Sequence, residues 1–382
     1  MTSAGCTEMQ KFRNNRMFCS FRRNRQFTGH VQFYFQHNIT LHFLLRLSPF
    51  MASKNLFLFW LKNARYHALP QSVIPACLAA CLAFGQEGFQ LFYAILAVLG
   101  ASLGHLGINL FDDFFDYLKK ETIFRNKMAL QGMRARIGKC PYLISNQATL
   151  KQLLCACCIF SGLALSVALV IYFKRGNAIL IFAGLTAFLG LFYSAWPFRL
   201  SYHGLGEMTV GVIFGPLLMS GVYYAACGHF VPSLLFISIP IGLFVTNILY
   251  VHSILDYEPD KNVGKRTLAV LLDNKRLMLA ALMVFILSPY LIICAGIYTG
   301  FLSKYFFFVF VTLPMALELF RLMWLYTRDS KREIQRKFWM GPMNNWDRII
   351  SNGIEWFMIR WYIARNLLVF FCLIVFLASI CG

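Results

Sequence analysis

Charged residues are scarce in this sequence. They make up 14% of its 382 residues, while apolar residues make up 58% and the mean hydropathy is +0.59. Soluble domains carry about 25% charged residues, so this chain has too little polar surface to cover a water-facing globule. The composition excludes a row of ordinary soluble domains and predicts that most of the chain faces lipid or other helices.

Acidic residues are the rarer charged class, with 16 Asp and Glu against 36 Lys and Arg and a net charge of +20. A basic excess can indicate a nucleic-acid partner. In a chain this apolar, the basic bias of cytoplasmic loops explains the excess better, and no nucleic acid is expected. Three of the twelve cysteines, Cys155, Cys157 and Cys158, lie in an apolar run where a thiol is usually a small buried hydrophobe. Neither disulfides nor zinc are predicted.

Residues 1–50 lack an apolar run long enough for a signal-peptide core or a membrane span. They hold seven basic residues and one acid, Glu8, and a second methionine, Met51, precedes a more regular start. We expect a disordered basic extension over 1–50, explained by a start codon assigned too early, with a basic amphipathic membrane anchor as the alternative. Residues 51–382 are expected to form the membrane domain.

Apolar runs of roughly 17–25 residues recur along the rest of the chain, which is the length needed to cross about 30 Å of hydrocarbon. We therefore predict an all-α integral membrane protein with about nine transmembrane helices. The expected helices cover residues 66–85, 90–111, 150–173, 178–196, 207–227, 231–254, 276–299, 304–326 and 361–381.

The loops on the two faces of the membrane differ in their number of basic residues. With a cytoplasmic N-terminus, the cytoplasmic segments after residue 50 carry 25 Lys and Arg, and the opposite face carries three, namely Lys174, Arg175 and Lys304. Cytoplasmic loops are enriched in basic residues, so this asymmetry predicts nine spans in the cell inner membrane with the N-terminus inside. The pattern indicates no particular oligomeric state.

Six of the sixteen acidic residues fall in two five-residue windows. Each window follows an apolar helix at its cytoplasmic end, the first after the second expected span and the other after the sixth. That spacing predicts two similar four-helix halves that face each other, with a ninth helix added. The acids are Asp112, Asp113 and Asp116 in the first window and Asp256, Glu258 and Asp260 in the second.

In the first window, GHLGINLFDDFFDY, the residues Asn109, Asp112, Asp113 and Asp116 recur at i, i+3, i+4 and i+7. Helical geometry puts them on one face. Three carboxylates so close repel one another and lose hydration, which a bound cation relieves. Hard oxygen ligands suit Mg²⁺, which binds carboxylates together with phosphate oxygens and water.

In the second window Asp256 and Asp260 are spaced at i and i+4, and Pro259 is expected to end the helix there. A pair of solvated acidic helix ends is the plain alternative to metal binding. Acids at a helix C-terminus oppose the helix dipole, and the cytoplasmic face is otherwise basic, so the metal interpretation is favoured.

Basic residues follow both windows. Lys265 and Arg266 come soon after the second window, in the segment GKRT. The first window is followed by Lys119, Lys120, Arg125, Lys127, Arg134, Arg136 and Lys139. Metal ions and cations together clamp phosphoryl groups, so the sequence predicts a diphosphate site with two Mg²⁺ ions. Any single lysine here is otherwise a generic charge of the cytoplasmic side.

These motifs resemble those of the UbiA-type prenyltransferase superfamily. NLFDDFFD is similar to its NxxDDxxD motif, and DYEPDKNVGKRTLAV is similar to its DxxxD motif followed by GKxTL. ARYHALPQSVIP and LFYSAWPFRLSYHGLGE resemble further segments of the dihydroxynaphthoate prenyltransferases of menaquinone synthesis. The likeness runs from about residue 60 to the end, and it implies nine transmembrane helices around a central cavity.

The resemblance also implies roles for individual residues. Asn109, Asp112, Asp113 and Asp116 would hold a first metal ion, and Asp256 and Asp260 a second, with Asp112, Asp116, Asp256 and Asp260 central to catalysis. Substrate contacts would come from Arg65, Asn109, Tyr193, Arg199, His252, Lys265 and Arg266. Of these, Lys265 and Arg266 would hold diphosphate and Arg65 either diphosphate or acceptor. Glu207 matches a family position near the cavity mouth. Interfacial packing is the alternative for Arg65, Tyr193, Arg199 and Glu207, and helix packing is the alternative for His252.

The sequence departs from the family pattern at three places. VHSILD stands where the second motif usually reads NNxRD, so no arginine adjoins Asp256. His203 stands in place of an arginine, and the loop 117–149 lacks the usual glycine-rich stretch. These departures bear on the acceptor more than on the chemistry.

The implied function is Mg²⁺-dependent transfer of a polyprenyl group from its diphosphate to an aromatic acceptor, with dihydroxynaphthoate of menaquinone biosynthesis as the first candidate. The prenyl chain and the membrane lipid would share the apolar surroundings. One alternative is a UbiA-type enzyme with another acceptor, such as 4-hydroxybenzoate, haem or a lipid precursor. Another is a cation-coupled transporter, because membrane-embedded acids often mark ion paths. Transporters place such sites near the bilayer midplane, whereas these acids lie at helix ends.

Overall fold

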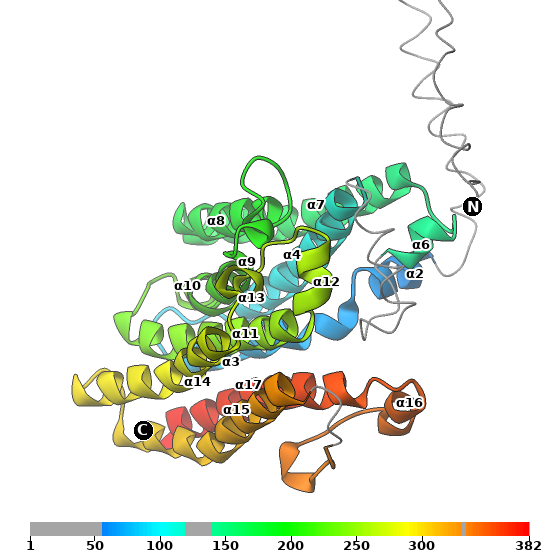
Figure 1. Cartoon of the computed structure of the whole chain (residues 1–382). Helices are drawn as coiled ribbons and strands as arrows, with labels where there is room; N and C mark the ends of the chain where they lie inside the picture. Colours follow the sequence, from blue (N-terminus) through cyan, green and yellow to red (C-terminus); the bar gives the residue numbers. More distant parts are fainter. Residues whose placement is uncertain (1–55, 119–139, 330–333, 382) are drawn as a thin grey trace, which may run out of the picture. The chain divides into compact units, whose positions relative to one another are not determined.

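The computed structural model describes residues 56–118, 140–329 and 334–381 (Figure 1). By its internal contacts the chain divides into two units, Met1–Leu56 and Phe57–Gly382, and the fold described is that of the second unit. The extension expected over 1–50 and the basic residues of 119–139 lie outside the described residues.

Every apolar run that the sequence marks as a span is helical, and no strand occurs in the described ranges. Seven of these helices are long and apolar enough to cross a membrane. They are α4 (Leu91–Leu118), α7 (Leu150–Arg175), α9 to α10 (Gly206–Cys227), α11 with its preceding turn (Pro232–Leu255), α14 (Lys275–Tyr298), α15 with its preceding turn (Lys304–Arg328) and α17 (Glu355–Cys381). The predicted all-α membrane fold is confirmed, and the protein is a multi-pass membrane protein.

Two further apolar helices lie where the first and fourth spans are expected. They are α3 (Pro70–Ala83), with 14 residues, and α8 (Ala178–Phe192), with 15 residues. A straight crossing needs about 20 residues, so the count of nine spans stays a prediction. The remaining short helices are α2 (Leu56–Asn63), α6 (Pro141–Ile144), α12 (Tyr257–Asn262), α13 (Leu268–Leu272) and α16 (Trp346–Ser351).

Polar residues fix where two of the spans begin. At the start of α7, the Thr149 backbone N–H donates to Oε1 of Gln152 at 2.8 Å, and the Gln152 N–H donates to Oγ1 of Thr149 at 3.3 Å. This reciprocal pair satisfies two backbone groups that the first turn leaves without partners. At the start of α14, Oδ1 of Asn274 accepts from the Arg276 N–H at 2.8 Å. Both starts agree with the predicted spans to within one residue.

The helices that carry the aspartate windows have equivalent neighbours. The first-window helix α4 packs against α7, and the second-window helix α11 packs against α14, which in each case is the next long span along the chain (Figure 1). In addition α11 contacts α9 and α17, and most of its residues are buried. This arrangement agrees with two similar halves and places α11 in the core.

Glycines let the fifth span approach α11 closely. The fifth span joins α9 (Gly206–Val212) and α10 (Leu218–Cys227) through a π-helical turn, η3 (Ile213–Leu217). A Cβ atom on Gly215 would lie 2.5 Å from both the Cα of Gly242 and the carbonyl oxygen of Ser238. Small residues allow backbones to meet in this way, which is a main source of helix association in membranes.

Replacing Gly215 with alanine should therefore force the two backbones apart and destabilise the protein by about 1–3 kcal/mol, as overpacking does in other cores. Thermal unfolding of the purified protein in detergent measures the effect. Gly184→Ala is the matched control, because a Cβ atom there meets nothing within 4 Å. Equal unfolding temperatures for the two variants would contradict the close-packing argument.

Candidate active site

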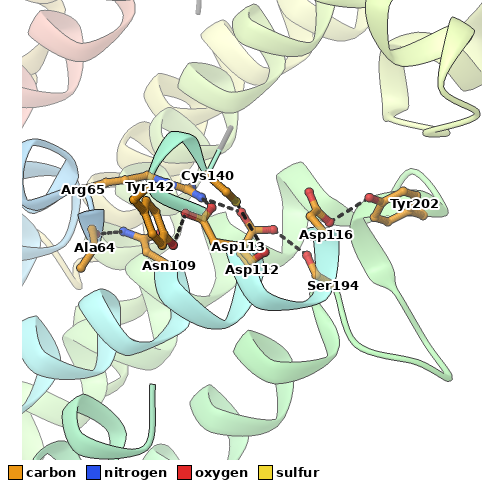
Figure 2. A network of polar contacts seen from close by, with 10 residues as sticks. All are labelled: Ala64, Arg65, Asn109, Asp112, Asp113, Asp116, Cys140, Tyr142, Ser194 and Tyr202. Carbon is orange, nitrogen blue, oxygen red and sulfur yellow. Dashed lines mark hydrogen bonds and ion pairs between the residues drawn. The ribbon is translucent and has the colours of Figure 1, made fainter. Parts of the chain in front are cut away.

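The first aspartate window lies on the last two turns of α4, which continues unbroken to Leu118. Its side chains form a row along one side of the helix (Figure 2). Asp113 and Asp116 are each only 3% exposed. Buried carboxylates need partners, and the protein supplies them.

Arg65 is the main cationic partner of this row. Its Nη2 lies 3.2 Å from Oδ2 of Asp112 and also pairs with Oδ1 of Asp113 (Figure 2). Burial alone would lower the pKa of Arg65, but Asp113 and Asp112 raise it above its ordinary value, so the guanidinium stays charged. Arg65 has a φ of 61°, in the left-handed region that non-glycine residues rarely adopt. The ion pairs offset the strain of this backbone conformation.

Two tyrosines satisfy the remaining oxygens of Asp113 and Asp116. Tyr142 on α6 donates to Oδ2 of Asp113 at 3.1 Å, and Tyr202 donates to Oδ1 of Asp116 at 2.8 Å (Figure 2). Burial and the neighbouring Asp113 raise the pKa of Tyr142, so its hydroxyl remains a donor. These two carboxylates are thus held by other side chains, and neither is among the residues that line the cavity described next.

Asp112 and Asn109 take a different position in the row. Both line a cavity of about 420 Å³. Oδ1 of Asp112 accepts from Oγ of Ser194 at 2.6 Å, and Nδ2 of Asn109 donates to the carbonyl oxygen of Ala64 at 3.0 Å. The Asn109 bond ties α4 to the segment that carries Arg65, so it helps to place that cation beside Asp112.

The second window occupies a bend between two helices. α11 ends at Leu255, Asp256 follows, and α12 begins at Tyr257. The expectation that Pro259 ends the helix is wrong. Pro259 lies in the first turn of α12, where a proline is tolerated because that turn has backbone N–H groups without helical partners. The backbone N–H of Asp260 donates to the carbonyl oxygen of Asp256 at 2.9 Å and closes the bend.

Both windows contribute to the same cavity. Asp256 and Asp260 line it together with Asp112, although their positions in the sequence are almost 150 residues apart. Lys265 and Arg65 also line it, and so do Glu207 and the predicted substrate residues Tyr193 and His252. Nε2 of His252 lies 3.4 Å from Oδ2 of Asp256.

Two predicted substrate residues are not among those that line the cavity. The Arg199 guanidinium lies over the ring of Tyr202, 4.0 Å from its centroid. Arg266 pairs through its backbone with His203. Arg199 and Arg266 therefore contact the loop that carries Tyr202. Because Tyr202 donates to Asp116, both residues can affect the site through that loop.

Glu207 joins three elements at the cavity wall. Its Oε1 accepts from Oγ of Ser253 at 2.6 Å and from the Leu268 N–H at 3.2 Å. The side chain is 3% exposed, and it links α9 to α11 and to the start of α13. Its position fixes the helix α13 that follows Lys265 and Arg266.

The carboxylates around the cavity suit a Mg²⁺ ion that binds together with a substrate. The described residues hold no group of three or more His, Cys, Asp or Glu side chains close enough to hold a metal by themselves. Mg²⁺ in substrate complexes usually takes one or two carboxylates and completes its shell with phosphate oxygens and water. Carboxylates from two windows around one cavity suit that kind of ion, so the residues fit a metal that arrives with a phosphorylated substrate.

Sequence reasoning missed several residues of the site. Tyr142, Ser194 and Tyr202 donate to the first window from other elements. His105 and Ser72 form a hydrogen-bonded pair, and His105 lines the cavity. The sequence offered one signal, because His105 stands four residues before Asn109 on the same helix face. The other contacts join residues far apart along the chain, which periodicity does not detect.

Comparison with known proteins identifies the family of this chain. Residues 72–346 match the UbiA prenyltransferase family. The chain belongs to this family. The predicted resemblance is thereby confirmed, and the match favours a prenyltransferase over the transporter alternative.

Individual relatives agree with the family match. The chain is 28% identical over 217 residues to the 1,4-dihydroxy-2-naphthoate octaprenyltransferase of Escherichia coli. This match covers 56% of this chain and 68% of that protein. It is 32% identical over 155 residues to the 2-carboxy-1,4-naphthoquinone phytyltransferase of Synechocystis, covering 41% of this chain but only half of that relative. The fold is similar to that of a UbiA homolog from Aeropyrum pernix, with a TM-score of 0.55, 17% identity, and coverage of 83% and 98% of the two chains.

Proposed function

We propose that this UbiA-family protein transfers a polyprenyl group from its diphosphate to an aromatic acceptor, with 1,4-dihydroxy-2-naphthoate as the first candidate and menaquinone biosynthesis as the pathway. The observation that carries the proposal is the shared cavity, which Asp112 enters from α4 and Asp256 and Asp260 enter from the bend after α11. The names of the relatives from Escherichia coli and Synechocystis support a naphthoate-type acceptor.

Asn109, Asp112, Asp256 and Asp260 are the residues that would hold two Mg²⁺ ions. Bound Mg²⁺ would neutralise the leaving diphosphate, which lowers the cost of breaking the C–O bond. The roles of Asp113 and Asp116 as metal ligands stay predictions. For Asp113 to ligate a metal directly, the ion would have to replace its pair with Arg65.

The chain's own cations attract the substrate. Arg65 and Lys265 line the cavity beside the carboxylates, where they can bind the diphosphate oxygens that the carboxylates would repel. Part of the cavity wall is apolar, with Ile108, Val210 and Phe214 among its residues. An apolar wall keeps out water that would quench an allylic cation, and it leaves the acceptor ring as the available nucleophile.

A second cavity, of about 1,140 Å³, offers room for the rest of the prenyl chain. It is lined mainly by apolar residues, and on α4 these extend from Leu91 to Ser102. The first cavity lies along the next part of the same helix, from His105 to Asp112. From Asp112 to Leu91 the helix rises about 30 Å, which suits a long polyprenyl chain rather than a single isoprene unit.

The basic residues set the proposed orientation. The asymmetry of 25 against three Lys and Arg supports an orientation with both aspartate windows on the cytoplasmic side of the cell inner membrane and the N-terminus inside. A diphosphate head group and a soluble naphthoate would both reach the site from that side.

The test is prenyl transfer by the purified protein in lipid nanodiscs. Each reaction contains radiolabelled polyprenyl diphosphate, Mg²⁺ and one acceptor. The acceptors are 1,4-dihydroxy-2-naphthoate, 4-hydroxybenzoate, haem and a glycerophospholipid precursor. The expected result is a labelled product with dihydroxynaphthoate alone. A product with another acceptor would support prenyl transfer but contradict dihydroxynaphthoate as the acceptor. Failure with every acceptor, together with cation flux into liposomes, would overturn the proposal.

A further inference from the structure

A buried histidine lines the candidate active site below the aspartate windows. His105 is 4% exposed and lies on α4 one turn before Asn109 and two turns before Asp112, so it shares their face. Two turns of helix separate His105 from Asp112 by about 10 Å along the axis. The imidazole is therefore beyond direct reach of a diphosphate held at the windows.

The hydrogen bonds of His105 indicate which ring nitrogen carries the proton. Its Nδ1 lies 2.7 Å from Oγ of Ser72 on α3, and both residues are buried. The Ser72 hydroxyl has one hydrogen, which it donates to the carbonyl oxygen of Leu69 at 3.1 Å. Ser72 therefore accepts from Nδ1–H of His105, and the neutral imidazole keeps its lone pair on Nε2.

The other ring nitrogen is an acceptor in a fixed position. In the part of the chain that the structure describes, Nε2 of His105 has no hydrogen-bond partner. The ring also packs on Phe214, with centroids 4.6 Å apart and a tilt of 48°. Phe214 belongs to the π-helical turn η3, an irregularity that is frequent at functional sites. Ser72 and Phe214 thus hold the imidazole from two sides before any ligand binds.

We propose that His105 binds the aromatic acceptor by accepting a hydrogen bond from a ring hydroxyl at Nε2, with Ser72 as the positioning residue. This inference rests on the proposed prenyl transfer. The prenyl diphosphate supplies no donor, because its chain is hydrocarbon and its phosphate oxygens are acceptors. A phenolic hydroxyl is a donor, and it gives the buried acceptor the partner that it would otherwise lack.

Two other polar side chains of the cavity wall are already engaged. Glu207 accepts hydrogen bonds from Ser253 and Leu268, and Asn109 donates to Ala64. His105 adds an acceptor for a hydroxylated ring, and a site built to pair a hydroxyl rejects analogues that lack it. The ring hydroxyl would also fix the angle at which the nucleophilic carbon meets the prenyl chain.

Two substitutions of His105 distinguish the roles of its two ring nitrogens. The side-chain amide of glutamine reaches the position of Nε2, whereas that of asparagine stays near the position of Nδ1. His105→Asn keeps a partner for Ser72 but loses the acceptor in the cavity, so it should raise the KM for dihydroxynaphthoate at least about 10-fold. His105→Gln should stay within about threefold of wild type. The KM for prenyl diphosphate should not change in either variant.

Direct titration of the acceptor, without prenyl diphosphate, gives a readout that does not depend on catalysis. Wild-type protein should bind dihydroxynaphthoate at least about 10-fold more tightly than its dimethyl ether, which has no hydroxyl donor. His105→Asn should bind both equally. Equal binding of diol and ether by the wild type, or an unchanged acceptor KM in folded His105→Asn, would overturn the inference. Failure of the wild type to transfer prenyl groups, with the diol still preferred, would instead count against the proposed function.

Discussion

Asp112→Asn and Asp256→Asn should each lower prenyl transfer by about 100- to 1,000-fold, the range seen when one electrostatic contact to a transition state is removed. Each substitution keeps the side-chain volume and removes one negative charge from the cavity. Asp112 also pairs with Arg65, and Asp256 lies in the bend after α11. Two windows that act on one diphosphate should therefore give losses of similar size.

Asp347→Asn is the matched control for these variants. Asp347 lies on α16, is exposed, and does not line the cavity. Its activity should equal that of wild type, and thermal unfolding in detergent should show that all three variants fold. Wild-type turnover by folded Asp256→Asn would remove the second window from the mechanism and leave α4 as the sole source of the site's acidic chemistry.

Removing divalent cations should abolish prenyl transfer, and adding Mg²⁺ back should restore it. The cavity is lined by four carboxylates, from Asp112, Glu207, Asp256 and Asp260, against the two permanent cations of Arg65 and Lys265. A diphosphate adds several further negative charges to that balance. Without a metal the substrate would be repelled at close range, where electrostatic interactions are strong because little water screens them.

The measurement is turnover in EDTA, followed by titration with Mg²⁺. The same buffer with added NaCl, at the ionic strength of the EDTA solution, controls for salt effects. The protein should remain folded throughout, because the ion pairs of Arg65 with Asp112 and Asp113 do not depend on a metal. Full turnover in excess EDTA would show that Arg65 and Lys265 stabilise the leaving group alone.

Local patterns predicted much of this protein because its helices are long and apolar. The helix α7 begins at Leu150, where the apolar run of the third expected span begins. The i, i+3, i+4 and i+7 spacing of Asn109 to Asp116 placed the first window on one helix face. The resemblance of four sequence motifs pointed to the family that the match over 72–346 confirmed.

Long-range contacts were beyond these patterns. The spacing of the first window treats its three aspartates alike, yet Asp112 lines the cavity while Asp113 faces Arg65 and Tyr142. What separates them is the position of partners on other elements, which sequence spacing does not record. Proline propensity likewise misassigned Pro259, which lies in the first turn of α12 and does not end a helix.

Calorimetric titration of a non-hydrolysable prenyl thiodiphosphate into the purified protein tests the central claim most directly, because it measures the shared site without any acceptor. Wild-type protein should bind the analogue with Mg²⁺ and release it with EDTA. Binding should be lost both in Asp112→Asn and in Asp256→Asn, since each window holds part of one diphosphate site. Tight binding in EDTA, or binding that the Asp256→Asn change leaves intact, would contradict the claim that the two windows act together.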